Sequence, residues 1–256
     1  MAPLPDKAAD GDWPAPADVV NEAGSSDIVL LCEHASRHVP MGLRKLGLED
    51  ADLARHIAWD IGAGPLARRL AVALDAPAFL GAYSRLVIDL NRPLTSKASI
   101  PERSEATDIP GNIALTDADR RRRVDLIFKP YHDRIASCLA ERERRGRTTH
   151  IVSIHSFTPV FLGMTRPWHA GVLFNRSIEK GKALVRVLAD GGGLTIGVNQ
   201  PYFIQRTDDY GVPIHGEDRG HEALLIEVRQ DLVADEQGVD EWTDRLARAL
   251  REVFAS

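Results

Sequence analysis

The sequence has little of several features that would mark a specialised class of protein. It contains only two cysteines in 256 residues, Cys32 and Cys138, which are too few for the disulfide framework of a small secreted domain. It has no apolar run near the roughly 20 residues that span a bilayer. Lysine and arginine number 32 against 37 aspartates and glutamates, so the net charge of −5 indicates neither a nucleic-acid nor a membrane partner.

The N-terminus lacks the basic and apolar regions of a secretory signal. Residues 1–26 are rich in proline, alanine and aspartate, and we expect them to form a flexible N-terminal tail. Residues 27–256 are expected to form one domain, because a chain with 44% hydrophobic and 27% charged residues has the composition of an ordinary globular protein. From these features we expect a cytoplasmic protein.

Apolar runs and helical patterns alternate along the chain. The runs predict strands, and the helical patterns include one that is interrupted at Pro65. This alternation predicts the α/β class: a single domain with a mostly parallel (mixed) central sheet and helices on both faces. The expected strands are 28–31, 78–80, 86–90, 150–155, 171–174 and 224–228, and the expected helices are 50–74 (in two parts), 116–145 and 237–253.

Polar side chains stand at the ends of several predicted strands. His34 follows the first strand, His155 ends another, and Asn91 and Arg92 follow a third. A single histidine at such a place is more often structural, because buried polar groups usually find local partners. Ligand sites of parallel sheets, however, lie at the carboxyl ends of the strands, where these residues would meet.

Glu227 lies inside the apolar run of the last predicted strand. Burying a carboxylate is costly, so this side chain is expected to be paired, to bind a metal or to be catalytic. An ion pair with Arg229 is the structural alternative, since residues two apart on a strand share a face.

Together these residue types are the ones that a metal-assisted hydrolysis requires. Two histidines and a carboxylate are the ligand set of a catalytic zinc with an open water position. A further glutamate can take a proton from the water, and an arginine can stabilise the developing oxyanion. An Asn-Arg pair can hold a substrate carboxylate. The set predicts a hydrolase of an amide bond next to a carboxylate.

Five motifs carry a resemblance to a known family: CEHASRHVP, HIAWDIGA, YSRLVIDLNRP, IHSF and LLIEVRQDL. In this order, over residues 27–232, they resemble the N-formylglutamate amidohydrolase family, which is similar in fold to the zinc carboxypeptidases (a phosphorylase/hydrolase-like fold) and to acyl-amino-acid deacylases. The resemblance implies one zinc ion, with His34 and His155 as ligands. It also implies Arg85 polarising the scissile carbonyl, Asn91 and Arg92 gripping a substrate carboxylate, and Glu227 as general base.

The third metal ligand is not given by the peptidase pattern. That pattern has a glutamate three residues after the first histidine, and Arg37 stands there in this chain. Asp60 is the first candidate, because a helix over residues 53–60 would put Leu53, Ile57 and Asp60 on one face.

Glu33 is the second candidate, although strand alternation would point it away from His34. His56 could pair with Asp60 on a helix, and its expected role is in the second shell or at the surface. Glu33 could also orient the metal site rather than bind the metal.

The resemblance implies hydrolysis of an N-acyl amino acid such as N-formylglutamate, a small substrate that carries a carboxylate. Better-known members have proline before the first histidine and Ser-Gly after it, whereas this chain has Glu-His-Ala-Ser-Arg. A peptidase or peptidoglycan-type amidase with the same site is an alternative, as is a non-catalytic binding module. The long polar loop 91–114 would favour small substrates if it closes over the pocket.

Other nucleophiles are less well supported. Ser156 lacks the flanking glycines of a nucleophile elbow. Cys32 adjoins His34 closely enough in sequence to be considered, but a cysteine on an apolar strand usually behaves as a small hydrophobe. His132 is expected to face solvent or to cap a helical turn, and the run Arg120–Arg123 is expected to form a solvated helix face.

Overall fold

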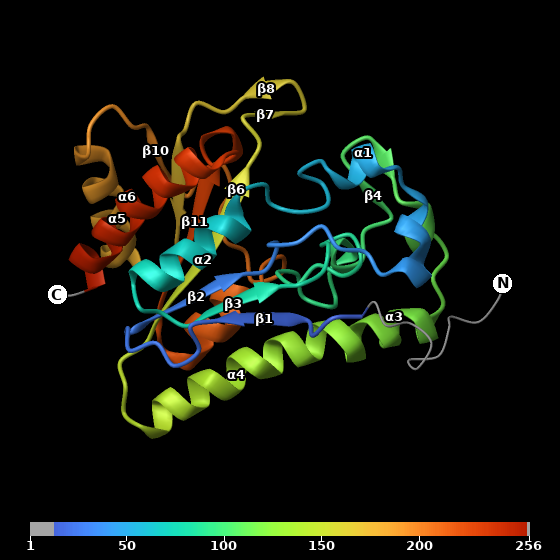
Figure 1. Cartoon of the computed structure of the whole chain (residues 1–256), viewed down its shortest axis with the longest axis horizontal. Helices are drawn as coiled ribbons and strands as arrows, with labels where there is room; N and C mark the ends of the chain where they lie inside the picture. Colours follow the sequence, from blue (N-terminus) through green and yellow to red (C-terminus); the bar gives the residue numbers. More distant parts are fainter. Residues whose placement is uncertain (1–12, 255–256) are drawn as a thin grey trace.

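The structure is a computed structural model that describes residues 13–254. A seven-stranded mixed sheet runs through its centre in the order β1-β3-β2-β6-β11-β9-β10 (Figure 1). Neighbouring strands are parallel except for the pairs β1–β3 and β11–β9. The predicted mixed, mostly parallel sheet is confirmed. The strands are β1 (Ala17–Val20), β2 (Ile28–Cys32), β3 (Ala78–Gly81), β6 (His150–Phe157), β9 (Ala170–Leu173), β10 (Ile196–Val198) and β11 (Glu222–Arg229).

Helices cover both faces of the sheet, as predicted. On one face α2 (Ala63–Ala73), α5 (Ile178–Asp190) and α6 (Glu236–Phe254) pack against residues such as Leu30. On the other face α4 (Lys129–Arg144) and the π-helical stretch 124–128, which joins it to α3 (Asp117–Arg123), pack against residues such as Leu31. Figure 1 shows this long helix along the lower side of the sheet. Alternate residues of β2 therefore pack into the two hydrophobic cores on opposite faces of the sheet, which explains its continuous apolar run.

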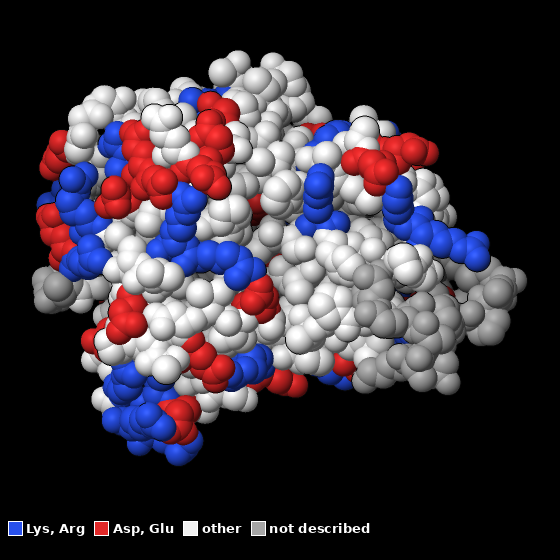
Figure 2. Space-filling view, viewed as in Figure 1, with Lys and Arg blue, Asp and Glu red and all other residues white. Residues whose placement is uncertain are grey.

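Short elements project beyond one edge of the sheet. They are α1 (Asp50–Leu53), the hairpin β4 (Arg103–Ser104) with β5 (Thr107–Asp108), and the hairpin β7 (Val160–Phe161) with β8 (Met164–Thr165). Both the α1–β4 region and the β7–β8 hairpin lie at the top of Figure 1. Lysine and arginine are interspersed with aspartate and glutamate over the face in Figure 2. Between residues 13 and 254, no helix combines the length and the apolar character that a bilayer crossing requires.

The expected N-terminal tail is partly wrong. Residues 17–20 form β1, an edge strand that pairs with β3 in antiparallel register, with Ala17 opposite Gly81. Asp18 on this strand also pairs with Arg68 of α2. A four-residue edge strand has too short a pattern to stand out in a proline-rich sequence. The earlier part of the predicted tail, residues 1–12, lies outside the described residues.

The predicted strand at 86–90 is also wrong, because this segment is a buried series of turns. Side chains satisfy its backbone instead of a neighbouring strand. Arg123 Nη1 donates to Val87 O at 2.8 Å, and Asn112 Nδ2 donates to Leu86 O at 2.8 Å. Arg123 is therefore buried rather than part of a solvated face, and burial lowers its pKa to about 10.

Two histidines lie buried together below the sheet, His132 of α4 and His215 of the π-helical turn Gly211–Gly216. His132 Nδ1 and His215 Nε2 are 2.8 Å apart, and the rings of Phe128 and Tyr210 lie against His132. Burial is the main reason that the pKa of His132 falls to about 3 and that of His215 to about 4. The expectation that His132 faces solvent is wrong.

We expect this histidine pair to reduce stability in acid. Below about pH 6.5 each histidine gains a proton in the unfolded chain, whereas in the folded chain both stay neutral until the pH nears their lowered pKa values. Stability is thus full above pH 6.5 and falls below it, by about 2 kcal/mol per histidine at pH 5. Urea unfolding of the metal-free protein at pH 7.5 and 5 measures this loss.

The double variant His132→Phe/His215→Leu is the matched control. Whatever the substitutions cost at pH 7.5, the wild type should lose about 4 kcal/mol more than the variant on going to pH 5. Equal losses in the two proteins would contradict the prediction.

Candidate active site

A cavity of about 490 Å³ lies at the carboxyl ends of β2, β6 and β11, where the sheet topology led us to expect a ligand site. Residues of β4 and of the turn segment 85–92 line one side of it. Phe161 of the β7–β8 hairpin and several residues of the segment 201–209 also line it. All seven predicted site residues, His34, Asp60, Arg85, Asn91, Arg92, His155 and Glu227, border this cavity.

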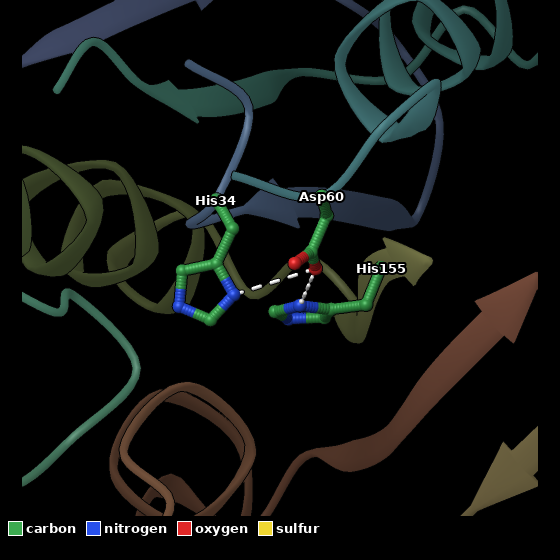
Figure 3. Close-up of side chains that lie close together, drawn as sticks. All are labelled: His34, Asp60 and His155. Atoms are coloured by element: carbon green, nitrogen blue, oxygen red, sulfur yellow. Dashed lines mark hydrogen bonds and ion pairs between the residues drawn. The ribbon is translucent and has the colours of Figure 1, made fainter. Parts of the chain in front are cut away.

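Three of these side chains meet at its base (Figure 3). His34 follows β2, Asp60 lies in a turn before α2, and His155 is on β6. Asp60 Oδ2 is 3.4 Å from His34 Nδ1 and 2.8 Å from His155 Nδ1, and each side chain offers one ligand atom within 4.8 Å of the others. All three are buried. This arrangement of two imidazoles and one carboxylate fits a divalent transition metal such as zinc.

Asp60 reaches this position by a route that the helical argument did not describe. Helix α1 ends at Leu53, and residues 54–60 form turns. The backbone brings the two residues together, because Asp60 N donates to His34 O at 3.0 Å. Leu53, Ile57 and Asp60 are all buried as expected, although they do not share a helix face.

The outer nitrogens of both histidines have carboxylate partners. His34 Nε2 lies 2.7 Å from Asp89 Oδ1, and His155 Nε2 lies 3.1 Å from Glu33 Oε2. Each Nδ1 faces Asp60 in the cluster, and with a metal bound there each Nε2 would carry the hydrogen that its carboxylate partner accepts. Carboxylates behind histidines orient metal ligands in this way in many proteins. Glu33 therefore stands behind His155 rather than beside the other ligand atoms.

These contacts keep the carboxyl groups of Glu33 and Asp60 at the base of the cavity ionised. Burial would raise the pKa of Glu33, but hydrogen bonds from His155 and Ser153 outweigh it and hold the pKa at about 2. Burial likewise opposes ionisation of Asp60, yet the neighbouring His34 and His155 hold its pKa well below the usual range. Its carboxylate is thus ready to bind a cation at neutral pH.

Glu227 differs from the other carboxylates at the site because it is buried and forms no ion pair with any residue between 13 and 254. It pairs with His155 in the parallel β6–β11 register, so the two side chains point to the same face. Among the described residues, its Oε2 has no hydrogen-bond partner, and burial raises its pKa to about 7. The alternative ion pair is excluded, because Arg229 Nε binds Asp231 at 2.8 Å. A carboxyl group with a pKa near 7 suits proton transfer at neutral pH.

Arg85 lies between two carboxylates at the cavity wall. It contacts Asp89 Oδ2 at 2.8 Å and Asp60 Oδ1 at 3.3 Å. Burial alone would lower its pKa, but these anions raise it above the ordinary value, so the guanidinium stays charged. With 23% of its side chain exposed, it can also face a bound substrate.

Asn91 and Arg92 link this wall to the segment 208–211. Asn91 Oδ1 accepts hydrogen bonds from Tyr210 N at 3.1 Å and Gly211 N at 2.9 Å. Arg92 Nη1 contacts Asp209 Oδ1 at 3.3 Å. Both residues thus have protein partners at the cavity, and their role in gripping a substrate carboxylate stays a prediction.

The long loop 91–114 forms part of the cavity wall. Glu105 binds His56 at 3.1 Å and Arg55 at 3.0 Å, which fastens the loop to the turns after α1. His56 borders the cavity but does not belong to the His34–Asp60–His155 cluster. The loop therefore lines the pocket, and its preference for a small substrate stays a prediction.

The alternative nucleophiles have structural roles. Cys32 packs into the core beneath α2, on the opposite side of β2 from the His34 cluster, and burial raises the pKa of its thiol well above the usual range. A thiol of that kind is unreactive. Ser156 Oγ donates to Ile61 O at 2.7 Å and so fixes the turn that follows Asp60.

Sequence reasoning missed two partners of the cluster. Asp89 lies in the motif YSRLVIDLNRP, to which the sequence assigned only Arg85, Asn91 and Arg92, and Ser153, which donates to Glu33 Oε2 at 2.7 Å, had no predicted role. The spacing offered a signal for Ser153: on a strand it shares a face with His155, two residues later. Asp89 gave no such signal, because its segment is irregular.

Comparisons with known proteins identify the family and the fold. A family model described as N-formylglutamate amidohydrolase matches residues 26–234. A gene product of Agrobacterium tumefaciens of known structure is 35% identical, with a TM-score of 0.91 over 95% of this chain and 96% of that chain. The N-formylglutamate amidohydrolase of Ralstonia eutropha shares the fold at 16% identity, with a TM-score of 0.69 over 94% and 97% of the two chains.

A search of curated proteins gives no match. The family model nevertheless spans the strands, the turn segments and the cavity residues from His34 to Glu227. The chain belongs to the N-formylglutamate amidohydrolase family.

Proposed function

We propose that the protein is a metal-dependent amidohydrolase that removes the acyl group, such as formyl, from an N-acyl amino acid. The observation that carries this proposal is the Glu227 carboxyl group, buried and unpartnered at Oε2 within the described chain and bordering the cavity beside the His34–Asp60–His155 cluster. Burying such a group is costly, and a binding module has no use for it. Membership of an amidohydrolase family supports the same reaction class.

His34, Asp60 and His155 would hold the metal, and zinc fits this set of donors. When bound at such a site, zinc polarises a carbonyl and allows water to act as a nucleophile at neutral pH. The hydrogen bonds from His34 to Asp89 and from His155 to Glu33 fix both imidazoles with Nδ1 toward the ion.

Three side chains around the cluster would then each carry out one part of the reaction. Glu227 accepts a proton from the attacking water and donates it to the leaving amine as the C–N bond breaks. Arg85 stabilises the negative charge that develops on the carbonyl oxygen. Arg92, which borders the same cavity, binds the carboxylate of the amino acid, with Asp209 holding its guanidinium in place.

The wall formed by loop 91–114 supports a small substrate over a long peptide or glycan strand. Glu105 ties the loop to Arg55 and His56, so an extended chain would have to displace these ion pairs. A peptidase or peptidoglycan-type amidase with the same site would need this side of the cavity to be open.

The test is to purify the protein without chelator, quantify bound metal, and measure formate release from N-formyl-L-glutamate. We expect close to one zinc per chain and release of formate that stops on chelation and returns with added zinc. Zinc binding without hydrolysis of N-formyl- or other N-acyl amino acids would contradict the substrate class. Hydrolysis that survives complete metal removal would contradict the metal dependence.

The carboxylates behind the two histidines give a separate prediction. We expect Glu33→Gln and Asp89→Asn each to weaken zinc binding by about 10–100-fold, because each replaces the acceptor that orients one imidazole. Competition with a chelator of known affinity measures the change. Glu217→Gln, another buried glutamate that bonds to Arg176 N away from the cluster, is the control and should bind zinc as the wild type does. Unchanged affinity in both test variants would contradict the orienting role.

A further inference from the structure

One side of the cavity is built from aromatic rings held by a single buried cation. The Arg166 guanidinium lies 4.6 Å from the ring centroid of Phe161, 4.8 Å from that of Tyr202 and 5.8 Å from that of Phe157. Arg166 Nη1 also donates to the Tyr202 hydroxyl at 3.0 Å. Only 8% of Arg166 is exposed, and the three rings lie around this buried cation at cation–π distances. These rings line the cavity and are called the aromatic wall below.

The aromatic wall adjoins the predicted catalytic groups. Phe157 lies two residues after His155 on β6, and β11 carries Leu225 two residues before Glu227, on the same face. Leu225 pairs with Leu173 of β9, and both side chains line the cavity. Apolar surface therefore continues from the aromatic wall to the place where the acyl carbon would lie.

Another part of the cavity lining is polar and charged, with Arg85, Arg92 and Asp209 among its residues. If Arg92 binds the carboxylate of the amino acid, as the proposed function has it, the amine half of the substrate occupies this side. The acyl group lies across the scissile bond, where the aromatic wall, Leu173 and Leu225 offer apolar surface to it. A formyl group, which carries only hydrogen on its carbonyl carbon, would leave this wall without a contact.

The size of the cavity and its rim agree with a larger acyl group. A volume of about 490 Å³ falls in the range of pockets that hold drug-sized ligands, about 300–1,000 Å³. Next to the aromatic wall, Phe203 and the hairpin residues Leu162 and Met164 are largely exposed. Residues 157–165 include no charged side chain. The hairpin that carries them projects beyond the sheet at the top of Figure 1.

We propose that the enzyme prefers N-acyl amino acids whose acyl group is apolar and larger than formyl, with an aromatic acyl group seated against Phe157, Phe161 and Tyr202. This rests on the proposed amidohydrolase function and names its substrate class. Water adds to the acyl carbon, the C–N bond breaks, and the products are an apolar carboxylic acid and the free amino acid. Each methylene that becomes buried against the wall raises kcat/KM about fourfold.

The experiment compares kcat/KM for N-formyl-, N-acetyl-, N-butanoyl- and N-phenylacetyl-L-glutamate with the zinc-loaded protein, using release of glutamate as the common readout. We expect kcat/KM to rise along the series, by at least tenfold from acetyl to phenylacetyl. In Phe161→Ala the phenylacetyl-to-acetyl ratio should fall at least tenfold, and in Phe161→Leu it should fall less. Val160→Thr, on the same hairpin but not bordering the cavity, is the control and should keep the wild-type ratio.

A wild-type kcat/KM that stays constant or falls as the acyl group grows overturns the proposal. A Phe161→Ala variant that folds, binds zinc and keeps the wild-type phenylacetyl-to-acetyl ratio overturns it as well. If no compound of the series is hydrolysed, the proposed function fails on its own, and calorimetric binding decides the specificity. Tighter binding of the phenylacetyl than of the acetyl compound, lost in Phe161→Ala, supports the aromatic wall as an acyl site. Equal or absent binding overturns it.

Discussion

Replacing Glu227 with glutamine is expected to lower kcat/KM by about 10²–10⁴-fold while zinc binding stays intact. Glutamine keeps the shape of the side chain but cannot accept the proton of the attacking water. Burial raises the pKa of Glu227 to about 7, so the wild-type group can both accept and return a proton near neutral pH. Steady-state hydrolysis of an N-acyl amino acid, with zinc quantified in the same preparation, measures the effect.

Glu222→Gln is the matched control, since Glu222 begins the same strand and is only partly buried. It should retain wild-type activity. Loss of zinc from Glu227→Gln would mean that Glu227 is a metal ligand, and retention of activity would remove it from the reaction altogether.

The second large effect is expected for Asp60→Asn, which should weaken zinc binding by more than about 100-fold. This loss of affinity is larger than that expected for Glu33→Gln and Asp89→Asn, which change residues behind the ligands. The Asp60 carboxylate contacts both histidines of the cluster and, through its other oxygen, Arg85. An amide is a poor ligand for zinc, and its NH₂ group would face an arginine or an imidazole. Chelator competition measures the affinity, and thermal unfolding of the metal-free variant checks that it folds.

This result also decides between the two carboxylates considered as third ligand. If Asp60 is the ligand, Asp60→Asn loses far more affinity than Glu33→Gln. Zinc that remains bound to Asp60→Asn but is lost from Glu33→Gln would assign the ligand to Glu33 and contradict the arrangement in Figure 3.

The parts of the site that were predictable lie on regular strands. His34, His155 and Glu227 each stand at or near the end of an apolar run, and adjacent parallel strands bring such ends to one edge. The β2–β6–β11 order then places them together. Glu33 lies just past the end of β2 and bonds to Ser153 and His155, so alternation within the strand does not decide its position.

The parts that were not predictable depend on contacts between distant irregular segments. The run of apolar residues at 86–90 resembles a strand, and nothing local indicates that Arg123 and Asn112 will satisfy its carbonyl groups. Arg123 itself sits in a run of four arginines, of which it alone is buried. Local pattern carries no information on which charged residue of such a run finds a buried acceptor.

The histidine pair below the sheet was missed for the same reason. His132 lies in KPYHDR, between charged neighbours, and its partner His215 is 83 positions away. Only the packing of α4 against the Gly211–Gly216 turn makes His132 a buried residue.

The wide spacing of the cluster along the chain fixes when a metal could enter during folding. His34 and Asp60 are 26 positions apart, and His155 follows Asp60 by 95 positions. Two of the three donors are therefore synthesised long before the third, and only pairing of β2 with β6 unites them. Unlike a zinc finger, whose closely spaced ligands let the ion drive folding, this chain must complete its sheet from its apolar core alone. The metal would then bind only after the tertiary structure has formed. A nascent chain shorter than 155 residues, which lacks His155, could not retain the ion.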